Sequence, residues 1–192
     1  CELGGHAPFM VFGDANPVHA AKGAQLVKFL NTGQACISPN RIYVADKLVD
    51  EFVGTLAERV GKMKAGSGFE EGVTIGPLVN AAAVAKVEMH VNDASSHGAD
   101  IVCGGSRLTE GNLSNGHFFA PTVINGITPA MRIYREETFG PVAPIISFSD
   151  EHEALALAND THYGLAAYVY TRDIARAMRM FEGLNFGIIG IN

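Results

Sequence analysis

The chain has 192 residues and a formal net charge of −6, and 47% of its residues are hydrophobic while 18% are charged. This length and composition are typical of a globular protein that buries a sizeable core. The acidic balance and the scattered basic residues argue against nucleic acid and anionic membranes as partners. The longest apolar runs have the length of strands and fall short of the roughly 20 residues of a membrane span.

The N-terminus and the cysteines indicate the setting of the protein. The segment Cys1–Gly5 contains neither an initiating methionine nor the basic and apolar regions of a signal peptide, so we expect a fragment of a longer chain. Cys1, Cys36 and Cys103 are odd in number and lack the spacing of metal ligands, so we expect neither a disulfide framework nor a metal site. We therefore predict a reduced, cytoplasmic protein.

Short apolar runs alternate with amphipathic stretches from the start of the chain. Pro8–Phe12 is predicted to be a strand, and Asn16 offers an N-cap for a helix with Pro17 at its first position. Apolar residues at helical spacing extend this helix to about Thr32, where Gly33 provides a C-cap.

The same alternation continues to the C-terminus. Further strands are expected at Arg41–Ala45, Asp100–Cys103, Phe118–Ile124, Val142–Phe148, Ala166–Tyr170 and, as a last buried strand, Gly187–Ile191. Further helices are expected from Asp46 to near Gly66, from Asn80 to Gly98, over Glu151–Asn159 and over Asp173–Glu182. The pattern predicts one α/β domain over residues 1–192, with a mostly parallel sheet covered by helices. The segment Leu108–His117, rich in Gly, Asn and Ser, is predicted to be a mobile loop.

Cys36 is the first candidate for chemistry. It follows Gly33-Gln34-Ala35 in a connection between a predicted helix and a predicted strand, where a side chain is held firmly and remains reachable. A thiol there can act as a nucleophile if its pKa is lowered or a base lies nearby. Judged alone, an isolated cysteine in an α/β protein is more often a small core residue.

Acidic side chains beside glycines form two further candidate sites. Glu2 lies close to Gly4, and glycine lets the backbone approach a ligand closely. Glu137 and Phe139 precede a Gly-Pro turn and an apolar strand. Considered singly, each segment also has an ordinary structural interpretation. Glu2 would be a solvated acid next to a glycine turn, and Glu137 and Phe139 would belong to a charged loop whose phenylalanine packs in the core. The histidines lack metal-ligand spacing and are predicted to be surface or capping residues: His6, His19, His90, His97, His117, His152 and His162.

Taken together, these segments resemble the aldehyde dehydrogenase superfamily, and succinate-semialdehyde dehydrogenases in particular. Glu2-Leu3-Gly4-Gly5 resembles the glutamate signature of the family, and Asn31–Cys36 (Asn-Thr-Gly-Gln-Ala-Cys) resembles its cysteine signature. Glu2 and Cys36 are 34 positions apart, as is usual in the family. Further matches cover the whole chain: Gly76-Pro77-Leu78, Phe119–Val123, Glu136–Val142, Tyr163–Ala167 and Gly187–Asn192.

The resemblance implies a cysteine mechanism. Cys36 would attack the aldehyde to give a thiohemiacetal, hydride would pass to NAD or NADP, and Glu2 would activate the water that hydrolyses the resulting thioester. Glu137 would hold the nicotinamide ribose, Phe139 would pack beside the nicotinamide, and Gly4 would line the cofactor site. The resemblance also makes Asn31 and Arg41 structural, and it places Asn192 at the substrate funnel.

The resemblance further implies that residues 1–192 are a catalytic domain, without the coenzyme-binding and oligomerisation parts that bind most of the cofactor. We expect the isolated piece to fold with little activity, and the intact enzyme to be a homodimer or homotetramer acting on a small aldehyde. Two departures bear on succinate semialdehyde as the substrate. Leu30 stands where many such enzymes have an arginine that binds the substrate carboxylate, and Ser38 stands where several have a second cysteine.

Three alternatives stay open at this point. The enzyme would act on a different semialdehyde or on an uncharged aliphatic aldehyde, the chain would be a non-catalytic module that keeps the motifs for packing, or Cys36 and Glu2 would form a thiol esterase without a cofactor.

Overall fold

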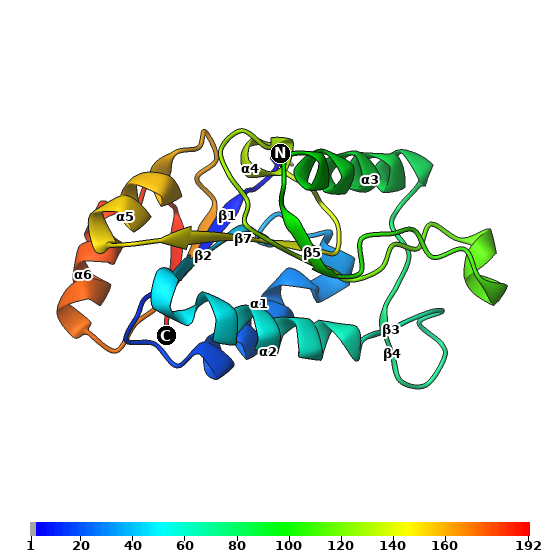
Figure 1. Ribbon diagram of the computed structural model, residues 1–192, viewed down its shortest axis with the longest axis horizontal. Helices are drawn as coiled ribbons and strands as arrows, with labels where there is room; N and C mark the ends of the chain where they lie inside the picture. The colour runs from blue at the N-terminus through cyan, green and yellow to red at the C-terminus, as the bar shows by residue number, and fades with distance from the viewer. Residues whose placement is uncertain (1–2) are drawn as a thin grey trace.

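The computed structural model describes residues 3–192, and its centre is a seven-stranded sheet in the order β5-β6-β7-β2-β1-β8-β9 (Figure 1). Its strands are β1 (Ala7–Val11), β2 (Pro39–Ala45), β5 (Asp100–Cys103), β6 (Thr122–Asn125), β7 (Val142–Phe148), β8 (Ala166–Tyr170) and β9 (Ile188–Ile191). Only the pair β5–β6 is antiparallel within this sheet. A separate two-stranded sheet joins β3 (Lys64–Ala65) to β4 (Val73–Ile75). The predicted α/β fold with a mostly parallel sheet is confirmed.

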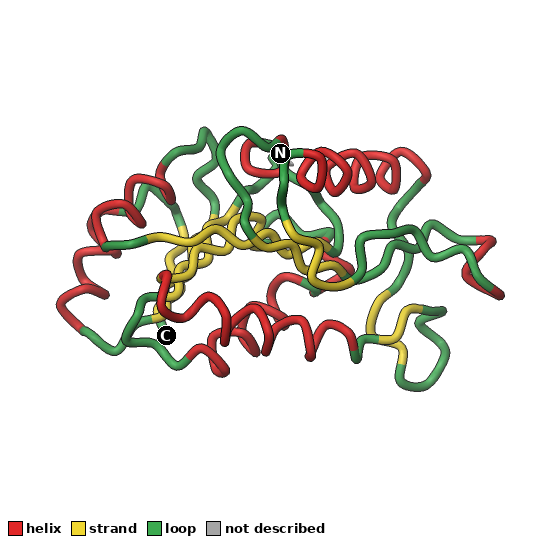
Figure 2. Tube along the Cα trace, in the orientation of Figure 1, coloured by secondary structure: helices red, strands yellow, loops and turns green. Residues whose placement is uncertain are grey.

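Helices cover both faces of the sheet, as Figures 1 and 2 show. One face carries α1 (Pro17–Lys28) and α2 (Val49–Gly61). The other face carries α3 (Ala81–Ser96), α4 (Arg132–Arg135), α5 (Glu151–Asn159) and α6 (Ile174–Gly183). Alternate residues of the central strands enter the two cores, so that Phe9 of β1 packs toward α1 and α2 while Met10 packs toward α3. Burial on both faces explains why these strands are continuous apolar runs.

The first helix begins as predicted and ends earlier. Asn16 caps α1 by accepting a hydrogen bond from the backbone N–H of His19 at 2.9 Å. The helix ends at Lys28 and not near Thr32, because Asn31 and Thr32 have positive φ angles of 49° and 60°. Gly33 is therefore the end of a short 3₁₀ turn and not the cap of α1.

The buried face of α1 also differs from the expected apolar line. Ala20, Ala21 and Ala24 are fully buried, whereas Leu26 is 63% exposed. Small side chains allow the helix to lie close to the sheet, and that close approach has more influence here than the positions of the large apolar residues.

Several boundaries and one burial assignment also differ from the predictions. Asp46 begins a 3₁₀ turn and does not cap α2, which starts at Val49. The sixth strand begins at Thr122, after the proline that disfavoured a regular start. The last strand, expected to be buried, is an edge strand in which Ile188 is 56% exposed, because β9 pairs only with β8.

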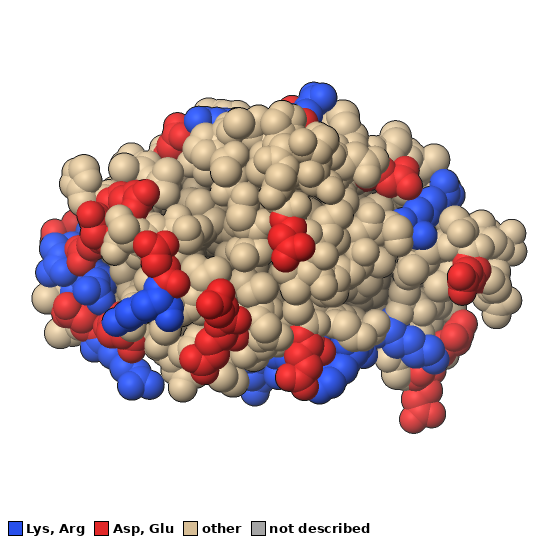
Figure 3. Space-filling model, viewed as in Figure 1, with Lys and Arg blue, Asp and Glu red and all other residues tan. Residues whose placement is uncertain are grey.

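The carboxyl ends of the parallel strands carry a network of ion pairs. Arg176 of α6 binds Asp14, which follows β1, at 2.8 Å and Glu151 of α5 at 3.0 Å, and Arg179 also contacts Glu151. Figure 3 shows acidic and basic side chains interspersed at this end of the molecule. Within residues 3–192, no helix combines the length and the apolarity that a membrane span requires.

A buried arginine ties the sheet to the helix layer. The Arg41 side chain on β2 is fully buried, and its Nε donates to the carbonyl of His6 at 3.0 Å. Its two terminal nitrogens donate to the carbonyls of Leu157 and Ala158 near the end of α5, at 3.1 and 3.0 Å. The guanidinium thus binds two carbonyls near the end of α5, and the Tyr43 hydroxyl also donates to that of Leu157 at 3.1 Å, as expected of a structural residue.

We predict that Arg41→Met lowers the free energy of unfolding by about 2–4 kcal/mol, because the carbonyls of His6, Leu157 and Ala158 each lose a hydrogen bond from the buried guanidinium. Urea denaturation of this variant and of the exposed control Arg107→Met would measure the effect. The control is expected to change stability by no more than about 0.5 kcal/mol. Equal losses for the two variants would contradict the structural role of Arg41.

Candidate active site

Four loop segments meet at the amino edge of the sheet. Gly4 precedes β1, Cys36 precedes β2, Glu137 and Phe139 precede β7, and Tyr163 precedes β8. These four strands are neighbours in the order β7-β2-β1-β8, and each adjacent pair is parallel. Segments that enter parallel neighbours arrive at the same edge, so residues far apart in the sequence become close in space.

The half-buried Cys36 lines two hollows at this edge. The first, of about 570 Å³, is shared with Gly4, Glu137 and Phe139 and is called here the Cys36–Glu137 hollow. The second, of about 650 Å³, is shared with Tyr163 and is called the Cys36–Tyr163 hollow. Both have the size of small-molecule sites. The structure thus brings together four of the five predicted site residues, while Glu2 lies outside the described residues 3–192.

Gly5, the last residue of the glutamate signature, has to be a glycine because another stretch of backbone lies very close to it. A Cβ on Gly5 would overlap with the carbonyl oxygen of Cys36. The backbone N–H of Gly5 donates to Oε1 of Glu137 at 2.7 Å, and its carbonyl accepts from Nδ2 of Asn40 at 3.2 Å. A Cβ on Gly4 would lie 2.7 Å from Oε2 of Glu137. The two glycines therefore bring the cysteine loop and the Glu137 carboxylate against a single stretch of backbone.

The residues around Cys36 are fixed on both sides of the thiol. Gln34 accepts from the N–H of Val79 at 2.9 Å, and Nδ2 of Asn31 donates to the carbonyl of Gln34 at 3.0 Å. On the other side, the Tyr168 hydroxyl donates to the carbonyl of Ile37 at 2.9 Å. The expected structural role of Asn31 agrees with these contacts.

Gly33 connects the cysteine loop to the Glu137 loop. Its φ of 75° is in the left-handed region, and a Cβ there would overlap with the carbonyl of Gly140. Only glycine meets both requirements at this position. Gly33 of the cysteine signature therefore allows the cysteine loop and the Glu137 loop to be in contact.

The comparisons with known proteins agree with this arrangement. The model of the aldehyde dehydrogenase family matches residues 1–192. The chain belongs to the aldehyde dehydrogenase family. A succinate-semialdehyde dehydrogenase (NADP+) of Escherichia coli is 49% identical over 191 residues, which is 100% of this chain and 39% of the relative. A glutarate-semialdehyde dehydrogenase of Pseudomonas putida is also 49% identical, over 100% of this chain and 38% of the relative.

A solved structure of succinate-semialdehyde dehydrogenase from Burkholderia pseudomallei is similar throughout. Its sequence is 50% identical, its TM-score is 0.94, and the match covers 99% of this chain and 39% of that one. This aldehyde dehydrogenase chain thus spans about two fifths of the length of these relatives. The predicted family is confirmed.

A fully buried lysine supports this candidate site. Nζ of Lys28 donates to Oδ1 of Asn40 at 2.7 Å and to Oγ of Ser38 at 3.2 Å. Burial lowers the pKa of Lys28 to about 7, and the charge of Glu137 acts in the opposite direction. Because Asn40 in turn binds Gly5, the lysine holds the strand under Cys36 to the glycines beside it. Sequence reasoning missed Lys28, although it continues the helical spacing of Ala21 and Ala24.

Two histidines predicted to be surface or capping residues are buried, and those predictions are wrong. His6 is 1% exposed, its Nε2 lies 2.8 Å from the carbonyl of Tyr134, and burial lowers its pKa to about 3. His90 is fully buried between Val87 and Val91 on α3. The position of His90 between two apolar residues at helical spacing was the signal that would have indicated its burial.

The two described cysteines differ in their surroundings. Burial raises the pKa of the Cys103 thiol, which reduces its thiolate fraction at neutral pH. Cys103 lies in strand β5, whereas Cys36 lines both hollows. Within residues 3–192, no three His, Cys, Asp or Glu side chains are grouped so that they could hold a metal ion.

We predict that Gly5→Ala slows alkylation of Cys36 by iodoacetamide several-fold and destabilises the chain, because the new methyl group displaces the Cys36 carbonyl. The matched control is Gly54→Ala in α2, where an added Cβ meets nothing within 4 Å. That control is expected to stabilise the protein by up to about 1 kcal/mol and to leave labelling unchanged. Unchanged labelling in Gly5→Ala would show that the close approach does not shape the site.

We predict that the stability of the wild-type chain rises with pH above 7 relative to Lys28→Met. The folded pKa of Lys28 is about 7 and lies below the value of an unfolded lysine, so the unfolded chain binds the extra proton in that range. The difference in slope should approach, at most, about 1.4 kcal/mol per pH unit. Urea denaturation at pH 7, 8 and 9 measures it, with the exposed Lys22→Met as control. Parallel curves for wild type and Lys28→Met would refute a buried, easily deprotonated lysine.

Proposed function

We propose that this chain is the catalytic part of an enzyme that oxidises an aldehyde to a carboxylic acid with NAD or NADP. The observation that carries the proposal is the Cys36–Glu137 hollow, in which the predicted nucleophile and three predicted cofactor-binding residues meet. Membership of the aldehyde dehydrogenase family supports the reaction class. We also propose that the protein is cytoplasmic, as its cysteines indicate, and that the intact enzyme is a homodimer or homotetramer, as the family resemblance implies.

The residues of the Cys36–Glu137 hollow fit a nicotinamide riboside. The side chain of Phe139 is 36% exposed and offers an aromatic face, and Oε2 of Glu137 lies against Gly4. The carboxylate would accept hydrogen bonds from ribose hydroxyls, and the absence of a side chain at Gly4 leaves room for that carboxylate against the backbone. When bound, the nicotinamide supplies the hydride acceptor.

The protein groups would act in two stages. The Cys36 thiolate forms a bond to the aldehyde carbon, and the electrons of the carbonyl move to oxygen, where the backbone N–H of Cys36 stabilises the charge. Loss of the former aldehyde hydrogen as hydride, for which the nicotinamide would be the acceptor, would re-form the C=O bond and leave a thioester on Cys36. Glu2 would then remove a proton from water, which attacks the thioester carbon and releases the thiolate and the acid. The role of Glu2 rests on the glutamate signature.

For the substrate we propose succinate semialdehyde. The names of the two curated relatives support an aldehyde with a second, carboxylate end, because one acts on succinate semialdehyde and the other on glutarate semialdehyde. Leu30 is 55% exposed and provides no cation for that carboxylate. The cation would therefore come from elsewhere in the intact protein.

We predict that the intact enzyme prefers succinate semialdehyde to butanal in kcat/KM by at least about tenfold, which corresponds to a single good ionic hydrogen bond. Initial rates of NADH or NADPH formation with both aldehydes measure the ratio. A preference for butanal would reject a substrate that carries a carboxylate. The enzyme would then be a dehydrogenase of aliphatic aldehydes.

We predict that iodoacetamide labels Cys36 rapidly and stoichiometrically while Cys103 reacts slowly. Cys36→Ala should lower the rate of aldehyde oxidation by roughly a thousandfold or more, and Cys103→Ala should leave it unchanged. Peptide mapping by mass spectrometry identifies the labelled cysteine. Slow labelling of both thiols would favour a non-catalytic module.

A further inference from the structure

The loop that carries Glu137 and Phe139 has a strained backbone. Phe139 has a φ of 54°, in a region of backbone conformation that residues other than glycine rarely adopt. Such a conformation costs on the order of 1–3 kcal/mol and persists only where the surroundings hold it. The loop connects α4 to β7 and has no regular structure of its own, so its restraints come from neighbouring elements.

A buried imidazole binds this loop on both sides of Glu137. Nε2 of His90 lies 3.1 Å from Oε2 of Glu136, and its Nδ1 lies 3.1 Å from Oγ1 of Thr138. Since a carboxylate only accepts, Nε2 carries the proton and donates, while Nδ1 accepts from the Thr138 hydroxyl. The side chain of His90 is 0% exposed, so both ring nitrogens are committed to the loop.

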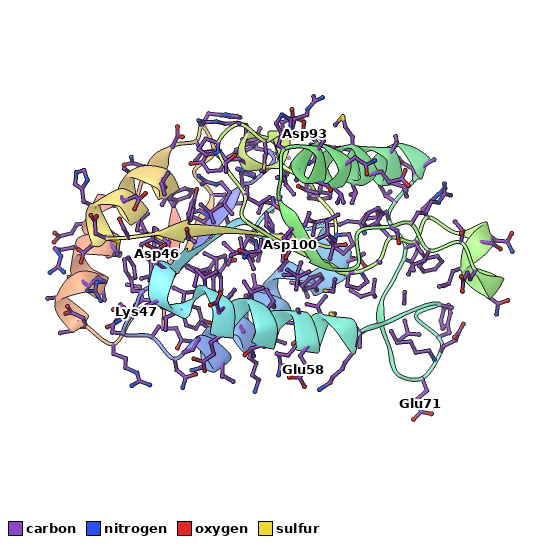
Figure 4. The ribbon with its side chains drawn as sticks, viewed as in Figure 1. Asp46, Lys47, Glu58, Glu71, Asp93 and Asp100 are labelled. Atoms are coloured by element: carbon purple, nitrogen blue, oxygen red, sulfur yellow. The ribbon has the colours of Figure 1, made fainter. Side chains whose placement is uncertain are left out.

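Other contacts of α3 and α4 support the same loop. Val87 lies one turn before His90 on α3. A Cβ on Gly140 would come within 2.5 Å of the Val87 side chain, so the loop packs closely on the helix here. Nε of Arg132 binds Oε1 of Glu136 at 3.0 Å, and the backbone N–H of Arg132 donates to Asp93 of α3 at 2.8 Å. Figure 4 shows Asp93 on α3 beside α4. The α3 helix is thus a platform for Glu136, Thr138 and Gly140.

We propose that His90 is a positioning residue that fixes Glu137 and Phe139 for the dinucleotide by bonding the residues on either side of Glu137. The inference rests on the proposed cofactor role of those two residues. His90 is not among the residues that line the Cys36–Glu137 hollow. Its effect on the reaction is therefore indirect and should fall on cofactor binding.

The charges around His90 suit a neutral ring. Burial lowers the pKa of His90, the adjacent Glu136 raises it, and Lys86 and Arg132 lower it further. A neutral imidazole has one donor and one acceptor, which matches a carboxylate on one side and a hydroxyl donor on the other. Protonation would turn Nδ1 into a donor and displace the Thr138 hydroxyl from its donating role.

Three variants separate the two contacts in the intact enzyme. His90→Leu removes both hydrogen bonds, His90→Gln keeps a donor near the Nε2 position for Glu136, and His90→Asn keeps an acceptor near the Nδ1 position for Thr138. We expect KM for the dinucleotide to rise on the order of tenfold in His90→Leu and by less in the other two, because small displacements of positioning groups are costly. KM for the aldehyde and the rate of Cys36 labelling should stay within about twofold of wild type.

Two further variants make the outcome decisive. Glu137→Gln must raise KM for the dinucleotide if the proposed cofactor site is correct, and Met89→Leu, next to His90 on α3, serves as the neutral control. If Glu137→Gln raises this KM and His90→Leu does not, the positioning role is overturned while the proposed function stands. If Glu137→Gln has no effect, the proposed cofactor site itself fails. If His90→Leu impairs aldehyde KM, labelling and dinucleotide KM equally, with no rescue by Gln or Asn, His90 is only structural and the inference is overturned.

Discussion

The amino ends of β7, β2, β1 and β8 lie at one edge of the sheet because these four strands are parallel neighbours. Every described part of the candidate site depends on this constraint. Gly4, Cys36, Glu137 and Tyr163 belong to four loops spread over most of the sequence, and none of them contacts the others through local chain geometry. The sheet supplies their proximity, and the loops supply their chemistry.

This placement is unusual for an open α/β sheet, where ligands more often bind outside the carboxyl ends of the strands. Here the carboxyl edge carries the ion pairs of Asp14, Glu151 and Arg176. Helices that follow strands begin at the carboxyl edge, so the amino edge receives helix C-termini, which carry a partial negative charge. Lys28 lies in the last turn of α1, where its protonated form would offset that charge. The buried lysine is thus suited to an amino-edge site.

The sequence is informative about elements whose signal is local. The strands Val142–Phe148 and Ala166–Tyr170 have the predicted bounds, because burial on both faces produces continuous apolar runs. The end of α1 could not be located in this way, since apolar residues at helical spacing continue to Leu30, while the left-handed backbone of Asn31 and Thr32 ends the helix. Burial of β9 was overestimated because apolarity does not reveal which strand lies at an edge.

The candidate site was predictable where residues match family signatures and unpredictable where they do not. Cys36, Glu137 and Phe139 belong to recognisable motifs. Lys28 and His90 do not, and their partners cannot be read from spacing, since His90 binds residues 46 and 48 positions away. Arg41 reaches 116 positions along the chain in the same manner. Long-range polar contacts of this kind depend on the finished packing, which a local pattern does not contain.

The arrangement of the site on entrance loops divides the molecule into two mutational classes. The bodies of β1 and β2 are fully buried but contribute no residue to either hollow, whereas the segments just before them line both. Variation within the strands should therefore shift the melting temperature while leaving substrate preference intact. Variation of the entrance loops should change substrate preference with less effect on the melting temperature, except at Gly5 and Gly33, which the close backbone approaches require. A deep mutational scan would then separate substitutions in the entrance loops, which mainly change specificity, from substitutions in the strands, which mainly change stability.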